Sequence, residues 1–309
     1  MMADRLRIGT RASALARWQA GWVADQLTAR GLQIELVPIT TCGDAAVGDS
    51  VAQLGSPGVF TKELQRALLE NAIDLAVHSL KDLPTDVVQG LTLAVVPPRA
   101  SPLDALISRE GHGLDELPLG ALVGTGSARR RAQLLHARPD LEIRGVRGNV
   151  DTRLQKLFAG SFDALVLAEA GLARLQQHER ITEVLPPEVM LPAVGQGALA
   201  IEARAGDLAT LEAVAPLDDL ASHQAVLAER ALLAALGGGC LAPVGAWART
   251  SASGELLLDA AVLRVDGRRR IAATLAGPRE DPEKLGAAVA ELLLAEGAAR
   301  LIEQSRVAG

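Results

Sequence analysis

Arginine gathers in one stretch of an otherwise acidic chain. The formal net charge is −6, yet the segment 129–153 holds seven arginines against three acidic residues, a local charge of +4. Arg129 and Arg130 begin a predicted helix after the turn 124–127, and Arg147 stands at a similar turn. Helix N-termini attract anions, and guanidinium groups grip carboxylates at two points. The pattern favours a small polycarboxylate over nucleic acid, with a solvated basic helix face as the plain alternative.

A lysine and an aspartate, Lys81 and Asp82, closely follow the compact apolar run 73–77. Such a run is typical of a buried strand in a parallel sheet. A carboxylate at the end of a strand can act as a general acid or base, or can stabilise a cation. A local surface ion pair explains these residues equally well, and His78 by itself indicates only a structural histidine.

A cysteine, Cys240, comes directly after three glycines. Glycines allow unusual backbone angles and the close approach of a bulky group, so this thiol can be a nucleophile or an attachment point. A free structural cysteine is the alternative. Cys42 has no such setting, and two distant cysteines exclude a disulfide framework and a zinc ribbon. We expect reduced thiols and no metal.

Alternating strands and helices must position these residues. The apolar spacing predicts strands at 6–10, 33–40, 73–77, 121–124, 142–146 and 164–168, and helices at 13–30, 61–71, 127–137 and 149–158. This alternation predicts α/β layers with parallel sheets. Proline-rich stretches at 97–102 and 186–192 indicate two crossings between two lobes joined by a hinge, with a cleft between them. From residue 219 the order changes to a helix, three strands and two helices, which predicts a small α+β domain.

Composition narrows the class of protein. The 309 residues suggest two domains, possibly three. Aromatic residues make up only 2% and tyrosine is absent, which argues against base-stacking nucleic-acid modules. The N-terminus has no apolar signal region, and no apolar run approaches the length of a bilayer span. We expect a cytoplasmic protein.

Together these segments resemble one family, the hydroxymethylbilane synthases, from about residue 5 to residue 300. No single motif is decisive, but their common order makes a chance match improbable. The motifs are Arg7 to Arg11 with Ser13 and Gln19, Gly43-Asp44, Phe60 to Asp82, Arg129-Arg130, Arg147 to Asn149, Thr152 to Leu154, Leu191 to Gly197, Glu229-Arg230, and Gly237 to Cys240 with Pro243.

The resemblance implies three domains. Residues 1–98 and 198–216 would form domain 1 and residues 102–192 domain 2, two lobes like those of periplasmic binding proteins, with mostly parallel sheets around a cleft. Residues 219–309 would form domain 3, a small α+β unit that carries Cys240.

It also implies a transferase of porphyrin, and thus heme, biosynthesis. Four porphobilinogens would be joined head to tail with loss of four ammonias, giving the linear tetrapyrrole hydroxymethylbilane. A dipyrromethane, held by a thioether on Cys240, would prime the chain. The partners would be porphobilinogen and the growing pyrrole chain, with no nucleic acid and no membrane, on a monomer.

Roles for individual residues follow from the resemblance. Asp82 would be catalytic, hydrogen-bonding pyrrole N–H groups and stabilising the cationic azafulvene formed when ammonia leaves. The cofactor would be bound by Cys240, Lys81, Asp82, Thr125, Ser127, Arg129 and Arg130. The substrate would be bound by Arg11, Ser13, Gln19, Arg147, Asn149, Arg153 and Gln196.

The chain departs from the family pattern in the loop 53–58, which lacks the lysine that many members have there. Since Pro57 stiffens it, we predict a less basic lid. Two other functions compete with the family reading. A two-lobed anion-binding protein would explain the arginines but not Cys240. A thiol hydrolase would need a histidine near Cys240, and no histidine follows it.

Overall fold

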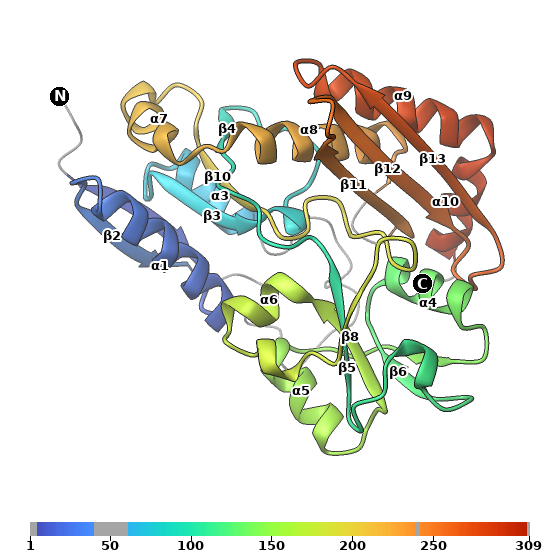
Figure 1. Ribbon diagram of the computed structural model, residues 1–309. Coiled ribbons are helices and arrows are strands. Elements are labelled where there is room, and N and C mark those ends of the chain that lie inside the picture. Colours follow the sequence, from blue (N-terminus) through green and yellow to red (C-terminus); the bar gives the residue numbers. More distant parts are fainter. Residues whose placement is uncertain (1–4, 40–60, 239–241, 308–309) are drawn as a thin grey trace. The chain divides into compact units, whose positions relative to one another are not determined.

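The computed structural model describes residues 5–39, 61–238 and 242–307. These divide into two compact units (Figure 1). The first comprises residues 1–99 and 198–223, and the second comprises residues 100–197 and 224–309. The second unit contains both a five-stranded sheet and the C-terminal three-stranded sheet. The three-domain division remains a prediction.

The first unit is a five-stranded sheet in the order β2-β1-β3-β10-β4. Its strands are β1 (Leu6–Thr10), β2 (Ile34–Pro38), β3 (Leu75–Ser79), β4 (Leu91–Val95) and β10 (Leu199–Arg204). β1 runs parallel to β2 and β3, whereas β10 runs antiparallel to β3 and β4. Four strands therefore point the same way, and only β10 opposes them.

Helices cover both faces of this sheet, because its central strands are apolar on both sides. Val23 and Leu27 of α1 (Ala14–Thr28) and Val214 of α7 (Leu208–Val214) pack on one face. Leu64 and Leu68 of α3 (Lys62–Leu69) pack on the other. The buried layers hold the carboxyl ends of β1 and β3 in place.

The second unit repeats this strand order as β7-β6-β8-β5-β9. The strands are β5 (Asp104–Ser108), β6 (Leu122–Gly124), β7 (Glu142–Arg144), β8 (Ala164–Ala168) and β9 (Glu183–Leu185). Here β5 is the one reversed strand, in the position that β10 takes in the first unit. The helices are α4 (Ala128–Ala137) on one face, and α5 (Val150–Phe158) and α6 (Glu169–Arg174) on the other.

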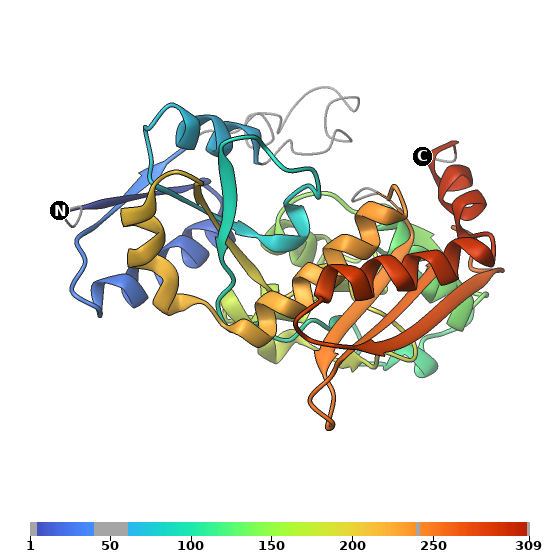
Figure 2. The ribbon, with the colours of Figure 1, turned by 90° about the horizontal axis from the view of Figure 1, so that it is seen from above.

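The C-terminal part is an antiparallel sheet of β11 (Val244–Thr250), β12 (Leu256–Leu263) and β13 (Arg270–Gly277). One face packs against α8 (Leu220–Ala235), α9 (Pro282–Ala295) and α10 (Ala298–Val307) (Figure 2). A Cβ on Gly286 of α9 would lie 2.3 Å from the carbonyl oxygen of Ala228, so only glycine allows this approach of α9 to α8. On the other face, Ala261 and Leu263 pack against Ala132 of α4.

The fold class expected from the sequence is confirmed. Two five-stranded α/β sheets of mostly parallel strands precede a small α+β C-terminal part. Short 3-10 helices lie between these elements at Leu80–Asp82 (η1), Leu114–Glu116, His178–Arg180 and Ala215–Leu217. Within the described ranges, no helix is both long and apolar enough to cross a membrane.

Candidate functional site

Most of the predicted site residues follow the carboxyl ends of strands that have at least one parallel neighbour. In the first unit, Arg11 follows β1 and Asp82 follows β3. In the second unit, Ser127 follows β6 and Asn149 follows β7. Ligands of α/β sheets bind at this edge because strand ends and helix N-termini meet there. Each unit therefore presents one such edge.

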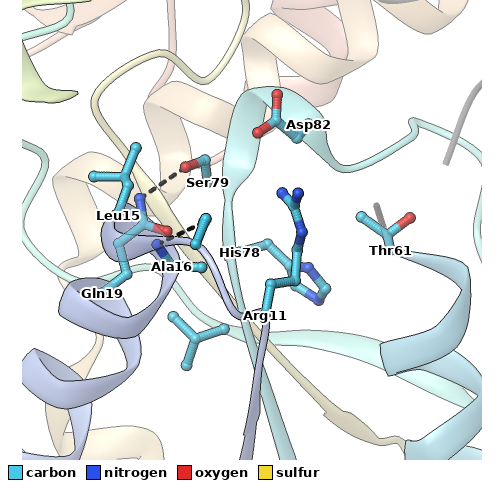
Figure 3. A pocket seen from close by; sticks show the side chains of 10 residues that line it. Arg11, Leu15, Ala16, Gln19, Thr61, His78, Ser79 and Asp82 are labelled. Carbon is cyan, nitrogen blue, oxygen red and sulfur yellow. Dashed lines mark hydrogen bonds between the residues drawn. The ribbon is translucent and has the colours of Figure 1, made fainter. Parts of the chain in front are cut away.

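The edge of the first unit contains a polar hollow (Figure 3). Its walls come from α1, β3 and η1, from the segment between β1 and α1, and from the residue before α3. Four of the predicted residues meet there, namely Arg11, Ser13, Gln19 and Asp82. The side chains of Arg11 and Asp82 extend into the same space. The other lining residues are Leu15, Ala16, Thr61, Val77, His78 and Ser79. The structure thus brings together a cation and a carboxylate that lie 71 positions apart in the chain.

Local hydrogen bonds fix this hollow. Ser13 caps α1, its Oγ accepting the backbone N–H of Ala16 at 3.3 Å. Gln19 is buried and donates through Nε2 to Ser79 Oγ at 2.7 Å. Asp82 is exposed on η1, a turn held in place by the buried Leu80. A fixed backbone therefore presents an accessible carboxylate, while Lys81 beside it is half-buried.

Beneath the hollow lies a buried acid that the sequence did not indicate. Glu202 accepts hydrogen bonds from Gln65 Nε2 at Oε1 (3.1 Å) and Oε2 (3.2 Å). His78 Nε2 lies 2.9 Å from Glu202 Oε2, an ion-pair distance, but without the direction of a hydrogen bond. The sequence pattern did not indicate Glu202, because β10 was not among the predicted strands. A charged residue within the apolar run 198–203 was the available signal.

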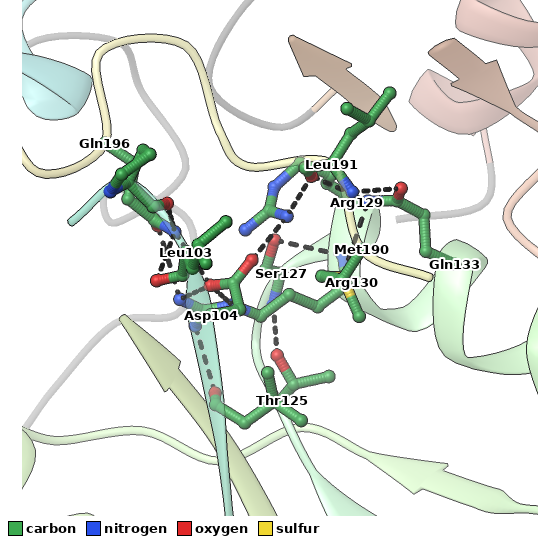
Figure 4. A network of polar contacts seen from close by, with 12 residues as sticks. Leu103, Asp104, Thr125, Ser127, Arg129, Arg130, Gln133, Met190, Leu191 and Gln196 are labelled. Atoms are coloured by element: carbon green, nitrogen blue, oxygen red, sulfur yellow. Dashed lines mark hydrogen bonds and ion pairs between the residues drawn. The ribbon is translucent and has the colours of Figure 1, made fainter. Parts of the chain in front are cut away.

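The edge of the second unit contains a buried ionic cluster (Figure 4). Asp104 is fully buried and accepts Arg129 Nη1 at 2.7 Å. Its other oxygen accepts Arg130 Nε at 2.9 Å and Nη2 at 2.7 Å, and Gln196 Nε2 at 2.9 Å. Burial alone would raise the pKa of Asp104, but the two guanidinium groups hold that pKa well below its usual range. Burial also lowers the pKa of Arg129, which Asp104 partly offsets.

Arg129 and Arg130, both predicted to bind carboxylates of the cofactor, thus already have a carboxylate partner inside the protein. Arg129 also donates to the carbonyl of Leu191 at 2.6 Å, and Arg130 donates to the carbonyl of Val166 at 3.0 Å. Two guanidinium groups face one carboxylate, so the cluster keeps a net charge of about +1. Arg129 Nε is buried without a hydrogen-bond partner among the described residues. Asp104 was missed, although an acid inside the apolar run 103–107 needs a buried partner.

The remaining predicted residues of the second unit shape two helix N-termini. Ser127 Oγ caps α4 by accepting the N–H of Arg130 at 3.4 Å, and Thr125 Oγ1 accepts the N–H of Ser127 at 3.3 Å. Asn149 Oδ1 caps α5 by accepting the N–H of Thr152 at 2.9 Å. Arg147 is exposed at this second turn. Arg153 is half-buried and donates through Nε to the carbonyl of Gly148 at 2.8 Å.

One further arginine was not foreseen. Arg174 lies at the end of α6 and donates through Nη2 to the carbonyl of Gly197 at 2.7 Å. Burial lowers the pKa of Arg174 to about 10, so it stays charged at neutral pH. No local pattern in the sequence distinguishes it from the other arginines.

Cys240 lies outside the described residues, as do Cys42 and the loop 53–58. Shortly before Cys240, α8 ends in a turn in which Gly237 adopts a φ of 59°, a left-handed backbone conformation that favours glycine.

Two family models match the chain in succession. "Porphobilinogen deaminase, dipyromethane cofactor binding domain" matches residues 6–212, and "Porphobilinogen deaminase, C-terminal domain" matches residues 223–295. A porphobilinogen deaminase of Syntrophotalea carbinolica is 50% identical over 304 residues, which cover 98% of this chain and 96% of that protein. One of Desulforudis audaxviator is 50% identical over 307 residues, 99% of each. Among solved structures, the methionine binding protein MetQ covers 68% of this chain and 90% of its own, at 13% identity and a TM-score of 0.42.

Proposed function

Since the chain belongs to the porphobilinogen deaminase family, we propose that it acts as a hydroxymethylbilane synthase through the residues located above. The resemblance predicted from the sequence is confirmed, and dipyrromethane is the cofactor named for the matched domain. The observation that carries the residue assignments is the hollow of the first unit, where Arg11 and Asp82 extend into one space.

Asp82 matches the demands of the substrate. Porphobilinogen carries a pyrrole N–H, an aminomethyl group that leaves as ammonia, and two carboxylates. An exposed carboxylate on an anchored turn can accept the pyrrole N–H and can face the positive charge left as ammonia departs. A preorganised charge of this kind stabilises a transition state without having to reorganise. Asp82 is therefore the catalytic residue of the proposal.

Arginines match the substrate's carboxylates. Arg11 in the hollow would bind one of them, beside the polar side chains of Ser13 and Gln19. In the second unit, Arg147 and Arg153 flank the N-terminus of α5, where the helix dipole adds to their charge. We assign these residues, with Asn149 and Gln196, to the substrate and the growing chain.

The side chains of the second unit also suit a dipyrromethane. Each of its two rings carries two carboxylates, and the Asp104 cluster keeps an excess positive charge and one unpartnered N–H at Arg129. We assign Lys81, Asp82, Thr125, Ser127, Arg129 and Arg130 to holding the cofactor, with Cys240 as its thioether anchor. When bound, the cofactor supplies the free pyrrole carbon to which the first substrate unit is joined.

The proposal is tested by the intact mass of the denatured protein. We expect an excess equal to two deaminated porphobilinogen units, which Cys240→Ser abolishes and the matched variant Cys42→Ser keeps. Ehrlich's reagent, which colours pyrroles, should give the same pattern. A bare polypeptide mass in all three proteins, even after incubation with porphobilinogen, would instead favour the anion-binding alternative.

The finer setting belongs to the same proposal. We expect the enzyme to work as a cytoplasmic monomer that binds neither nucleic acid nor membrane. Gel filtration with light scattering measures the first point directly, and a dimeric mass would contradict it.

A further inference from the structure

Three buried polar side chains lie beneath the hollow of the first unit, and the chemistry above assigns none of them a role. They are His78 on β3, Glu202 on the neighbouring strand β10, and Gln65 on α3. Each is more than nine-tenths buried. His78 also lines the hollow itself, as Arg11 does (Figure 3).

The pleat of the sheet explains why these three groups meet. Leu75 and Val77 of β3 point to the α1 face, so Ala76 and His78 point to the α3 face. Glu202 pairs with Ala76 across β10 and β3 and shares that face. Gln65 reaches both oxygens of Glu202 from α3, at 3.1 and 3.2 Å. The arrangement is therefore part of the framework that carries the strand ends.

The buried carboxylate of Glu202 needs a compensating charge. A carboxylate buried beside one neutral amide is costly unless a cation or a proton compensates it. His78 Nε2, 2.9 Å from Glu202 Oε2, is the group at hand. An imidazolium at this distance would balance the charge of the carboxylate. The wall of the hollow then presents no net negative charge to Arg11.

We propose that His78 is a positioning residue of the enzyme: by neutralising Glu202, it leaves the Arg11 guanidinium directed at the carboxylates of porphobilinogen. This inference rests on the proposed function, since it takes porphobilinogen as the ligand. Without His78, the charge of Glu202 would attract Arg11 toward the sheet and would repel the substrate. Among the described residues, the other charged group that lines the hollow is Asp82 on η1, while Gln19 of α1 and Thr61, which precedes α3, line it with uncharged groups.

The first test is a kinetic double-variant cycle at neutral pH. For His78→Gln we expect KM for porphobilinogen to rise about tenfold while kcat changes by less than about twofold, because uniform binding is lost. The double variant His78→Gln/Glu202→Gln removes the charge together with its partner. Its KM should return to within about threefold of the wild type. A double variant as impaired as His78→Gln would overturn the proposal.

The second test needs no turnover. ¹⁵N NMR of histidine-labelled protein resolves five imidazoles, and His78→Gln identifies the resonances of His78. Glu202→Gln should shift the His78 Nε2 resonance and leave the other four histidines in place. An unmoved His78 resonance would show that the charge of Glu202 does not act on His78, and would refute the inference.

Asp74→Asn is the matched control. Asp74 is a buried carboxylate just before β3, at the opposite end from His78, and pairs with Arg7 at 2.8 Å and Arg204 at 2.9 Å. This variant should lose stability and keep the wild-type KM. If its KM rose as in His78→Gln, the KM effect would reflect a general weakening of the sheet, and the proposal would be wrong. Intact masses are taken for every variant. A wild type with no mass excess and no product would overturn the proposed function, whereas the NMR shift would still decide the pairing of His78 with Glu202.

Discussion

Replacing Asp104 by asparagine should destabilise the protein strongly. The carboxylate is fully buried and accepts hydrogen bonds from Arg129 at 2.7 Å, from Arg130 at 2.7 and 2.9 Å, and from Gln196 at 2.9 Å. Asparagine keeps the shape but removes the charge, which leaves two guanidinium groups buried without a counter-ion. Breaking one side of a buried ion pair costs about 3–5 kcal/mol. We expect a loss of that size in the free energy of unfolding.

The pH dependence of stability should change in a defined direction. The pKa of Asp104 in the native protein lies well below its usual range, because Arg129 and Arg130 outweigh the effect of burial. Its contribution is therefore complete above the unfolded-state pKa of about 3.9, and is lost as the pH falls below that value toward the native pKa. Below pH about 4 the wild type should lose up to about 1.4 kcal/mol per pH unit more than Asp104→Asn.

Urea unfolding followed by circular dichroism at pH 7 and pH 3.5 measures both effects. Asp140→Asn is the control, since it breaks the partly exposed pair of Asp140 with Arg138 on the same unit, and a pair at the surface contributes little to stability. The reasoning is refuted if Asp104→Asn unfolds at the same urea concentration as Asp140→Asn. It is also refuted if the wild type and Asp104→Asn respond identically to acid.

Two further predictions concern catalysis and packing. Asp82→Asn should fold and keep the cofactor mass but lower kcat at least about 100-fold, because the charge that faces the developing cation is gone. Stopped product assays at saturating porphobilinogen measure kcat, and near-normal turnover would show that Asp82 takes no part in the chemistry. Gly286→Ala should destabilise the protein by about 1–3 kcal/mol, since its Cβ would lie 2.3 Å from the carbonyl oxygen of Ala228. Gly21→Ala in α1, whose Cβ meets nothing within 4 Å, should instead stabilise it by up to about 1 kcal/mol. Equal melting shifts of the two alanine variants would contradict the packing argument.

Apolar periodicity and helix-start signals, which extend over only a few residues, could be recognised in the sequence. The α/β alternation predicted the strands that precede Arg11, Asp82, Ser127 and Asn149, because apolar periodicity reports which face of an element is buried. Ser127 and Asn149 stand at the helix starts that the pattern indicated. Four strands were not predicted, among them β10 and β5, the two reversed strands.

The sequence by itself determined the fold class, the family and the residues that could do chemistry, since these depend on composition, period and the order of motifs. Only the tertiary structure decided which buried charges meet. Asp104 lies 25 positions from Arg129, and Glu202 lies 124 positions from His78. A reversed strand carries each of these acids beside its partner, and neither spacing has a local signature. Sheet order and side-chain packing set such pairings, because a buried charge is tolerated only where the fold supplies its counterpart.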